Sequence, residues 1–295
     1  MEREFHQPVL KEIALDFLIA DLNGVYVDAT VGDGGHAEEI LKRISRKGTL
    51  IGFDVDDDAL QISEKRLVSY ENKILLRENF INIHDALFRR NVQKICGCLL
   101  DIGVSSRQLD DRQRGFSFRG DAQLDFRMNR TQELTGEVVV NEYSEESLAE
   151  IFWKYGEERY ARKIAKRIVT ERVKKKIVTT TQLKEIVQKC IGGKFLVKSL
   201  ARIFQAIRMD VNNELENLSF CLEQAIPLLL PSGRIVVISY HSGEDRIVKQ
   251  CFLKHSQNSF HDLKILTKKP IVPTSEEISN NSRARSAKLR VAEKM

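Results

Sequence analysis

The sequence predicts an α/β fold in which a doubly wound, mostly parallel sheet is interrupted by a helical insertion. In the first third of the chain, short apolar runs alternate with amphipathic stretches, as they do in consecutive βαβ units. A run of the same buried-strand character returns only at residues 233–241, about 130 residues after the fourth strand. The residues between have helical periodicity, and they far exceed the roughly one dozen that a crossover needs.

Five strands are expected, and two late runs alternate enough in polarity to be strands as well. The second strand, TLIGFDVD, has the apolar content of a strand buried on both faces. Helices are expected at 37–46 and 59–70, and another ends at Pro231. The strands are expected at 25–30, 49–56, 73–79, 94–103 and 233–241, followed by two late runs with alternating polarity at 263–269 and 287–294.

The helical insertion is expected at residues 108–195. Tyr160, Ile164 and Ile168 recur at helical spacing, and the segment 179–193 opens with a threonine N-cap and closes with a glycine pair. The flanking segments, 1–107 and 196–295, would then form one discontinuous domain.

The five cysteines are expected to be small buried residues. An odd number in a chain of this length does not form a disulfide framework. Cys96 and Cys98 lie two apart, which would place both on one face of a strand. Cys190, Cys221 and Cys251 have no CxxC or HxxxH companions, so no metal site is expected.

The charge is unevenly distributed, although the net charge is only +5. Residues 159–176 hold nine basic side chains against one acid, Glu171, and residues 262–295 hold eight against four. Such clusters favour a polyanion, because each phosphate contact releases a counterion, and a solvated helix face is the alternative.

No apolar run approaches the roughly 18 residues of a membrane span. The charged first residues are also unlike a secretion signal. A cytoplasmic protein with no membrane partner is therefore expected.

Glycines and polar side chains follow the carboxyl ends of the first four strands. Gly34 and Gly35 lie in the turn after the first strand, where the lack of side chains lets backbone amides approach a ligand. Asp54 could accept hydrogen bonds from ribose hydroxyls, and Phe80 could pack on an adenine edge. With Asp101 at the end of the fourth strand, these residues predict one adenosine-sized crevice.

The crevice favours a cationic adenosine cofactor. It lacks the GxGxxG spacing, a GxxxxGK[ST] motif and a basic residue in its first turn, which counts against NAD and other pyrophosphate ligands. S-adenosylmethionine has no pyrophosphate, and its positive charges would be attracted by Asp28 and Asp101. An NAD-linked dehydrogenase is the alternative enzyme class, and helix capping is the alternative role of each acid.

Several long and unusual segments extend nearly from end to end, among them VDATVGDGGHAEEIL, LLDIGVSSRQLDDRQRGFSF, FQAIRMDVNNELE and NNSRARSAKLRVAE. Through them the chain closely resembles the bacterial small-subunit ribosomal RNA methyltransferase H family, RsmH or MraW. The resemblance implies a Rossmann-like, seven-stranded S-adenosylmethionine-dependent methyltransferase sheet with an RNA-recognising helical insertion. It also implies methylation of the exocyclic amino nitrogen of a cytidine in the decoding centre of 16S ribosomal RNA.

The resemblance implies which residues contact the cofactor, because positions of this sequence match the cofactor-binding positions of the family. Two of them, His36 and Gln108, rest on the resemblance alone. The implied cofactor contacts are Gly34, Gly35, His36, Asp54, Phe80, Asp101 and Gln108.

The sequence departs from the family pattern in three places. It reads KSLAR at 198–202 where HPATR is typical, SGED at 242–245 for SLED, and AQLDFRM at 122–128 where a proline and a methionine are usual. The first departure lies near the expected RNA face, so it affects substrate positioning more than methyl donation.

The amino nitrogen of cytosine is a poor nucleophile because its lone pair is delocalised into the ring. An enzyme must hold it in line with the methyl group and accept a proton afterwards. The segment DIGVSS has no DPPY-type motif, so Asp101, Ser105 and Ser106 are the candidate catalytic groups there. Tyr240 and His241 are expected at the same edge, where His241 would relay the proton, stack on the base or make only a structural hydrogen bond.

Two other functions remain as alternatives. One is an RNA-binding or assembly factor that keeps the fold without catalysis, and the other is a methyltransferase for another amine, in DNA or protein. The segment RGFSF, at 114–118, and the basic residues from Arg159 would contact the RNA, unless the two phenylalanines belong to the core of the insertion. A homodimer is left open.

Overall fold

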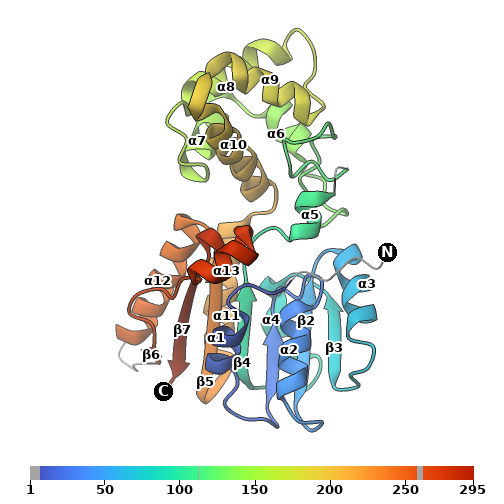
Figure 1. Cartoon of the computed structure of the whole chain (residues 1–295), viewed down its shortest axis with the longest axis vertical. Helices are drawn as coiled ribbons and strands as arrows, with labels where there is room; N and C mark the ends of the chain where they lie inside the picture. Colours follow the sequence, from blue (N-terminus) through green and yellow to red (C-terminus); the bar gives the residue numbers. More distant parts are fainter. Residues whose placement is uncertain (1–6, 112, 258–261) are drawn as a thin grey trace. The chain divides into compact units, whose positions relative to one another are not determined.

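The computed structural model describes residues 7–111, 113–257 and 262–295, so His6 of the family-like segment HQPVLKE lies outside the described residues. The chain divides into two compact units, Met1–Gly103 with Leu215–Met295, and Val104–Glu214. In Figure 1 the first unit is blue to teal and orange to dark red, and the second is green to ochre. Both boundaries of the second unit lie outside the expected 108–195.

The helix that follows the glycine pair explains the later boundary. Helix α10 (Leu196–Val211) packs against α6 (Gly136–Glu142), α7 (Glu145–Lys154) and α9 (Thr180–Cys190). The apolar side chains that it buries include Leu200, Ile203, Phe204 and Ile207. Helix α9 ends at Cys190, two residues before the glycine pair, and the second unit continues beyond the pair because this apolar face of α10 is buried within it. The other elements of the unit are α5 (Ser106–Asp110), α8 (Ala161–Arg172) and η2 (Gly193–Phe195).

The first unit is built on a seven-stranded sheet with the strand order β3-β2-β1-β4-β5-β7-β6, which confirms the predicted fold class. The first five strands are parallel, and β7 runs antiparallel to both of its neighbours. The bounds are β1 Val25–Asp28, β2 Thr49–Asp54, β3 Lys73–Arg77, β4 Ile95–Asp101, β5 Leu229–Ser239, β6 Leu263–Ile265 and β7 Lys288–Lys294.

The strand order reverses at β1, which has β2 on one side and β4 on the other. In open α/β sheets, ligands bind outside the carboxyl ends of the strands at such a switch point. A ligand site is therefore expected at the residues that end β1, β2 and β4.

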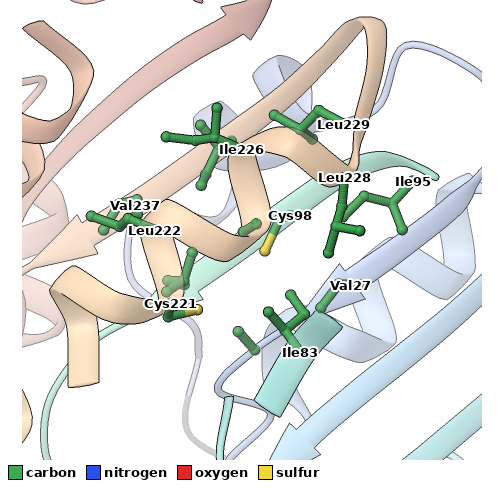
Figure 2. Close-up of a cluster of buried hydrophobic side chains, with 14 of the residues drawn as sticks. Val27, Ile83, Ile95, Cys98, Cys221, Leu222, Ile226, Leu228, Leu229 and Val237 are labelled. Carbon is green, nitrogen blue, oxygen red and sulfur yellow. The ribbon is translucent and has the colours of Figure 1, made fainter. Parts of the chain in front are cut away.

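Helices cover both faces of this sheet. On one face, Val27, Cys98 and Val237 pack against Cys221, Leu222 and Ile226 of α11, as Figure 2 shows. On the other face, Tyr26, Leu50, Leu99 and Val236 pack with Leu15, Leu18 and Ile40. The helices of this unit are α1 Lys11–Leu18, α2 Gly35–Arg43, α3 Asp57–Arg66, η1 Phe80–Asn82, α4 Ile83–Phe88, α11 Glu214–Leu228, α12 Ser242–Gln257, α13 Ser275–Asn280 and η3 Ser282–Ser286.

The expectation that Cys96 and Cys98 share one face of the strand is wrong. The pairing of β4 with β5 shifts register between Ile95 and Gly97, and such an irregularity changes which way the following side chains point. Cys98 lies in the core with Cys221, whereas Cys96 packs against the cluster on the opposite face. All five cysteines are free, and burial raises the pKa of the Cys98 and Cys221 thiols.

The join between α11 and β5 also differs from the expectation. The helix ends at Leu228 instead of reaching Pro231, with Pro227 in its last turn, and Leu229 already pairs with Ile95. Proline lacks the amide hydrogen that helix propagation uses, and Leu229 is buried, so the chain leaves the helix early. Among the described residues, no helix is long and apolar enough to cross a membrane.

Candidate cofactor site

Three aspartates are the last residues of three adjacent strands. Asp28 ends β1, Asp54 ends β2 and Asp101 ends β4. Parallel pairing in register places Asp28 beside Leu99 and beside Gly52, so the three strands end at one edge of the sheet. The sequence placed all three residues at strand ends, and the structure brings them to the switch point.

Asp54 is tied to the glycine turn and to the start of α3. Its Oδ2 accepts a hydrogen bond from the Gly32 amide at 2.8 Å, and its Oδ1 accepts one from the Asp56 amide at 2.8 Å. Capping of α3 falls to Asp56, whose side chain accepts from the Asp58 amide. Each oxygen of Asp54 has further acceptor capacity, so the carboxylate can also receive ribose hydroxyls. Burial raises its pKa to about 6.

The glycine turn brings backbone close to the same edge. Gly34 is the N-cap of α2 and has φ +80°, which favours glycine. A Cβ on Gly35 would lie 2.9 Å from Cγ of Pro8, which is too close without movement of the proline. Both positions therefore need glycine for reasons of space and conformation.

Asp28 is a buried carboxyl group with an unused oxygen. Its Oδ1 accepts a hydrogen bond from the Thr30 amide at 3.1 Å, whereas its Oδ2 has no hydrogen-bond partner in the described part of the chain. The Thr30 hydroxyl accepts from the Asp101 amide at 2.7 Å, which links the ends of β1 and β4. Burial raises the pKa of Asp28 to about 7, against the opposing influence of His36. A bound cation would stabilise the ionised form.

Asp101 lies between two side chains from different elements. The Tyr240 hydroxyl, after β5, donates a hydrogen bond to its Oδ1 at 2.9 Å. His36 of α2 places Nε2 at 3.4 Å from its Oδ2. The His36 ring is 6 % exposed, and neither nitrogen makes a hydrogen bond among the described residues. The structure thus brings His36, predicted from resemblance alone, to Asp101, and it gives Tyr240 a partner that the sequence did not identify.

His241 precedes α12, and its ring makes a hydrogen bond to the first turn of that helix. Its Nδ1 accepts a hydrogen bond from the Gly243 amide at 3.0 Å, which assigns the hydrogen of a neutral ring to Nε2. Glu244, 1 % exposed, accepts from the backbone amides of Tyr240 and His241 at 2.9 and 3.1 Å. Sequence reasoning missed Glu244, although it lies in the segment SGED. The structural hydrogen bond left open for His241 is present, and its proton relay stays a prediction.

Gly243 is one of the departures from the family pattern, and it touches this histidine. A Cβ at Gly243 would lie 3.0 Å from both Cε1 and Nδ1 of His241, so a larger side chain there would displace the ring. The orientation of His241 in this chain therefore depends on the glycine.

Phe80 follows β3 and begins η1, where Asn79 accepts a hydrogen bond from the Ile81 amide. Its ring is partly buried against the core cluster that contains Ile83. The aromatic side chain is thus held beyond the end of the strand, as expected.

Ser105, Ser106 and Gln108 belong to the second unit, where they start α5. The Ser105 hydroxyl accepts from the Gln108 amide at 3.1 Å, and the Gln108 side chain accepts from the Ser105 amide at 3.0 Å. These two residues therefore form a capping box, a structural role that sequence reasoning did not identify. Their cofactor and catalytic roles stay predictions.

The phenylalanines of RGFSF pack inside the second unit. Phe116 stacks edge-on with Phe126 at a centroid distance of 6.2 Å, and Phe118 does so with Phe204 at 5.4 Å. Of the two alternatives for these rings, RNA contact or the core of the insertion, these contacts support the core.

The basic segment contains both paired and unpaired side chains. Glu171 lies within 4.0 Å of Arg167, Lys174 and Lys189. Arg159, Arg162 and Lys166 are exposed and have no acidic partner in the described residues. Spaced by three and four residues, they lie on one side of α8 and its entry, and we call them the basic stripe. In the C-terminal segment, Lys288, Arg290 and Lys294 instead pair with Asp245 and Asp262.

Comparisons with known proteins cover nearly the whole chain. The model described as the MraW methylase family matches residues 3–295. A protein of Caldicellulosiruptor bescii named ribosomal RNA small subunit methyltransferase H is 45 % identical, over 98 % of this chain and 99 % of its own. A protein of the same name from Clostridium botulinum is 46 % identical over 98 % and 99 %. A solved structure of an rRNA methylase from Streptococcus thermophilus has 12 % identity and a TM-score of 0.47, covering 99 % of both chains.

Proposed function

The chain belongs to the MraW methylase family, and from that premise we propose that it methylates the exocyclic amino nitrogen of a cytidine in the decoding centre of 16S ribosomal RNA. The coarser activity is S-adenosylmethionine-dependent methylation of small-subunit ribosomal RNA, and the relatives are named ribosomal RNA small subunit methyltransferase H. Because ribosomal RNA of this kind is a cytoplasmic substrate, a cytoplasmic location goes with the proposal.

The observation that carries the proposal is the set of carboxylates at the switch point. Asp28 has a buried oxygen without a hydrogen-bond partner among the described residues, Asp54 has spare acceptor capacity, and Asp101 lies between Tyr240 and His36. This donor-poor, acidic edge fits a ligand with ribose hydroxyls and positive charge better than one with a pyrophosphate. S-adenosylmethionine has both features, and bound there it would supply an electrophilic methyl group.

We assign the binding of that cofactor to residues around this edge. Asp54 would accept the ribose hydroxyls, Phe80 would pack on the adenine, and Asp28 would balance the positive charge. The remaining contacts in the assignment are Gly34, Gly35, His36, Asp101 and Gln108.

Proton removal from the cytidine amino group is assigned among Asp101, Ser105, Ser106 and His241. The Tyr240 hydroxyl donates a hydrogen bond to Oδ1 of Asp101, and His36 Nε2 lies 3.4 Å from Oδ2, so the carboxylate is oriented and can accept a hydrogen bond from an amino group. In the His241 tautomer favoured by Gly243, the ring would donate from Nε2, and its Nδ1 is already an acceptor. We therefore place Asp101 first as the acceptor and His241 as a donor or stacking group.

RNA contact is assigned to the second unit. The basic stripe, Arg159, Arg162 and Lys166, offers three exposed cations that have no acidic partner in the part of the chain that the structure describes, which suits phosphate contacts. The C-terminal basic residues contribute less in this proposal, because Lys288, Arg290 and Lys294 are neutralised by acids of their own unit.

Two measurements test the cofactor and the activity. S-adenosylmethionine should raise the melting temperature of the protein and NAD should not, because only a ligand that binds the folded state stabilises it. A larger shift with NAD would overturn the cofactor assignment. Labelled methyl groups should reach small subunits that lack the modification, whereas binding without transfer would favour the assembly-factor alternative.

A further inference from the structure

We propose a second site, unrelated to methyl transfer, in which Glu223, Cys251 and His255 bind a zinc ion between α11 and α12. Glu223 lies on α11, and Cys251 and His255 lie four residues apart on one face of α12. One ligand atom from each of the three residues lies within 4.8 Å of the other two. The site joins two helices that cover the same face of the sheet.

The distances need little adjustment to enclose a metal. His255 Nε2 lies 3.0 Å from Glu223 Oε2, and Cys251 Sγ lies 3.9 Å from Glu223 Oε1. Ligand atoms around tetrahedral zinc are separated by about 3.2–3.8 Å, given metal–ligand bonds of about 2.0–2.3 Å. One thiolate, one imidazole and one carboxylate are a donor set that zinc accepts, with a fourth position for water.

Neighbouring charges suit a metal-bound histidine. His255 Nδ1 is buried and has no hydrogen bond among the described residues, yet Oδ2 of Asp262 lies 3.8 Å from it. A carboxylate on the far nitrogen of a ligating histidine fixes the tautomer that presents Nε2 to the metal. Lys254 Nζ donates to Glu223 Oε1 at 2.8 Å, which leaves Oε2, on the side of His255, for a single-oxygen contact.

The competing explanation is a metal-free hydrogen-bond cluster on Glu223. It accounts for the contacts of Lys254, Cys251 and His255 with this carboxylate. In that cluster a neutral ring that donates from Nε2 to Glu223 would leave Nδ1 as an acceptor facing the Asp262 carboxylate, whose Oδ2 lies 3.8 Å away. Zinc binding at Nε2 would place the hydrogen of the neutral ring on Nδ1, which faces Asp262.

The position indicates a structural role. Helix α12 begins at Ser242, beside the cofactor edge, and Cys251 lies about 14 Å further along its axis, given the rise of about 1.5 Å per residue. The metal would fasten the second half of α12 to α11 and would not contact the cofactor. The CxxC and HxxxH spacings do not describe this site, because its ligands are a Cys-x3-His pair and a glutamate from another helix.

The full-length protein, freed of metal by a chelator, is titrated with Co²⁺ as the spectroscopic probe for zinc. The expected result is one equivalent bound with a thiolate-to-cobalt charge-transfer band, which Zn²⁺ abolishes. Zn²⁺ should also raise the melting temperature. No band in the wild-type protein would overturn the proposal.

Variants locate the site. Cys251→Ser should lose the band and the zinc-dependent rise in melting temperature, whereas Cys96→Ser, a change at the partly buried thiol on the opposite face, should keep both. An unchanged band in Cys251→Ser would overturn the assignment. S-adenosylmethionine affinity reports whether each variant is folded, and if Cys251→Ser does not fold, His255→Gln replaces it with the same expected losses and the same contrary outcome.

Discussion

At the carboxyl ends of the strands, three aspartates differ in what their oxygens already bind. Asp54 holds two backbone amides, and Asp101 is held by a tyrosine and a histidine. Asp28 has one oxygen without a partner in the described chain, and burial raises its pKa to about 7. In the proposed function, Asp54 therefore recognises hydroxyls, Asp28 balances charge, and Asp101 orients the reacting groups.

Replacing Asp54 by alanine should weaken S-adenosylmethionine binding by about 1–3 kcal/mol, or about 5- to 150-fold, the scale of a lost buried hydrogen-bond pair. Isothermal titration calorimetry measures the affinity. Asp54→Asn is the matched control, since it keeps the shape and one acceptor oxygen and should lose less. Unchanged affinity in Asp54→Ala would remove Asp54 from the site.

Asp28 should make cofactor binding depend on pH. Its pKa of about 7 in the free protein means that the carboxyl group is mostly protonated below neutrality, and a cationic ligand favours the ionised form. Binding must then expel a proton below pH 7, so affinity should rise with pH by up to about tenfold per unit and level off above 7.

The pH effect is checked by calorimetry between pH 5.5 and 8.5 in buffers of different ionisation enthalpy, which counts the protons released. Asp28→Asn cannot ionise, so it should bind more weakly and lack this part of the slope. The same slope in both proteins would show that another group causes it.

Tyr240→Phe should slow methyl transfer by about tenfold, because Asp101 loses the hydrogen bond that orients it. Single-turnover rates measure the effect, and cofactor affinity separates it from binding. Tyr26→Phe is the matched control, since the Tyr26 hydroxyl bonds to the Asp21 carbonyl at 2.8 Å instead. It should lower stability and leave the transfer rate unchanged, and equal rates in all three proteins would contradict the positioning role of Tyr240.

Among the helices and strands, α8 allows the most specific prediction about RNA binding, because it has exposed basic side chains on one side. Reversing Arg162 and Lys166 to glutamate should flatten the dependence of RNA affinity on salt, with a slope smaller by about 1 to 2, since each contact to single-stranded RNA contributes about 0.7. Filter binding or fluorescence anisotropy over a salt series measures this slope.

A matched charge reversal controls for net charge. Arg46 and Lys47 are exposed and precede β2, at the amino edge of the sheet, so their reversal should leave the slope nearly unchanged. If both double variants flatten the slope equally, the effect is one of overall charge and the basic stripe is not a phosphate contact.

Elements were predicted more reliably than their ends. The strands were found because buried parallel strands are apolar throughout, and the two late strands because their polarity alternates. The end of α11 was missed because the apolar residues at the join, Leu228 and Leu229, suit a buried helix and a buried strand equally. The sequence did not predict that Cys96 and Cys98 point to opposite faces of the sheet. The register shift that separates them arises from the pairing of β4 with β5, and the residues of β4 alone do not indicate it.

Across the whole molecule, two units could be predicted because a long helical stretch separates the fourth strand from the fifth. The residues at the switch point could be predicted because the carboxyl ends of parallel strands lie at one edge of the sheet. The sequence could not predict contacts that depend on tertiary packing. The Tyr240–Asp101 hydrogen bond joins residues 139 positions apart, and Glu223 meets Cys251 and His255 across two helices. The boundary at Glu214 likewise depends on which core buries α10, a property of the folded second unit.

The identity of the methylated nucleoside tests the proposed function most directly. Small ribosomal subunits from bacteria lacking this enzyme are incubated with the full-length protein and methyl-labelled S-adenosylmethionine, and the RNA is digested and mapped by mass spectrometry. The expected result is label in N4-methylcytidine from the decoding centre of 16S ribosomal RNA. Label in a different nucleoside or region, or none despite tight cofactor binding, would contradict it.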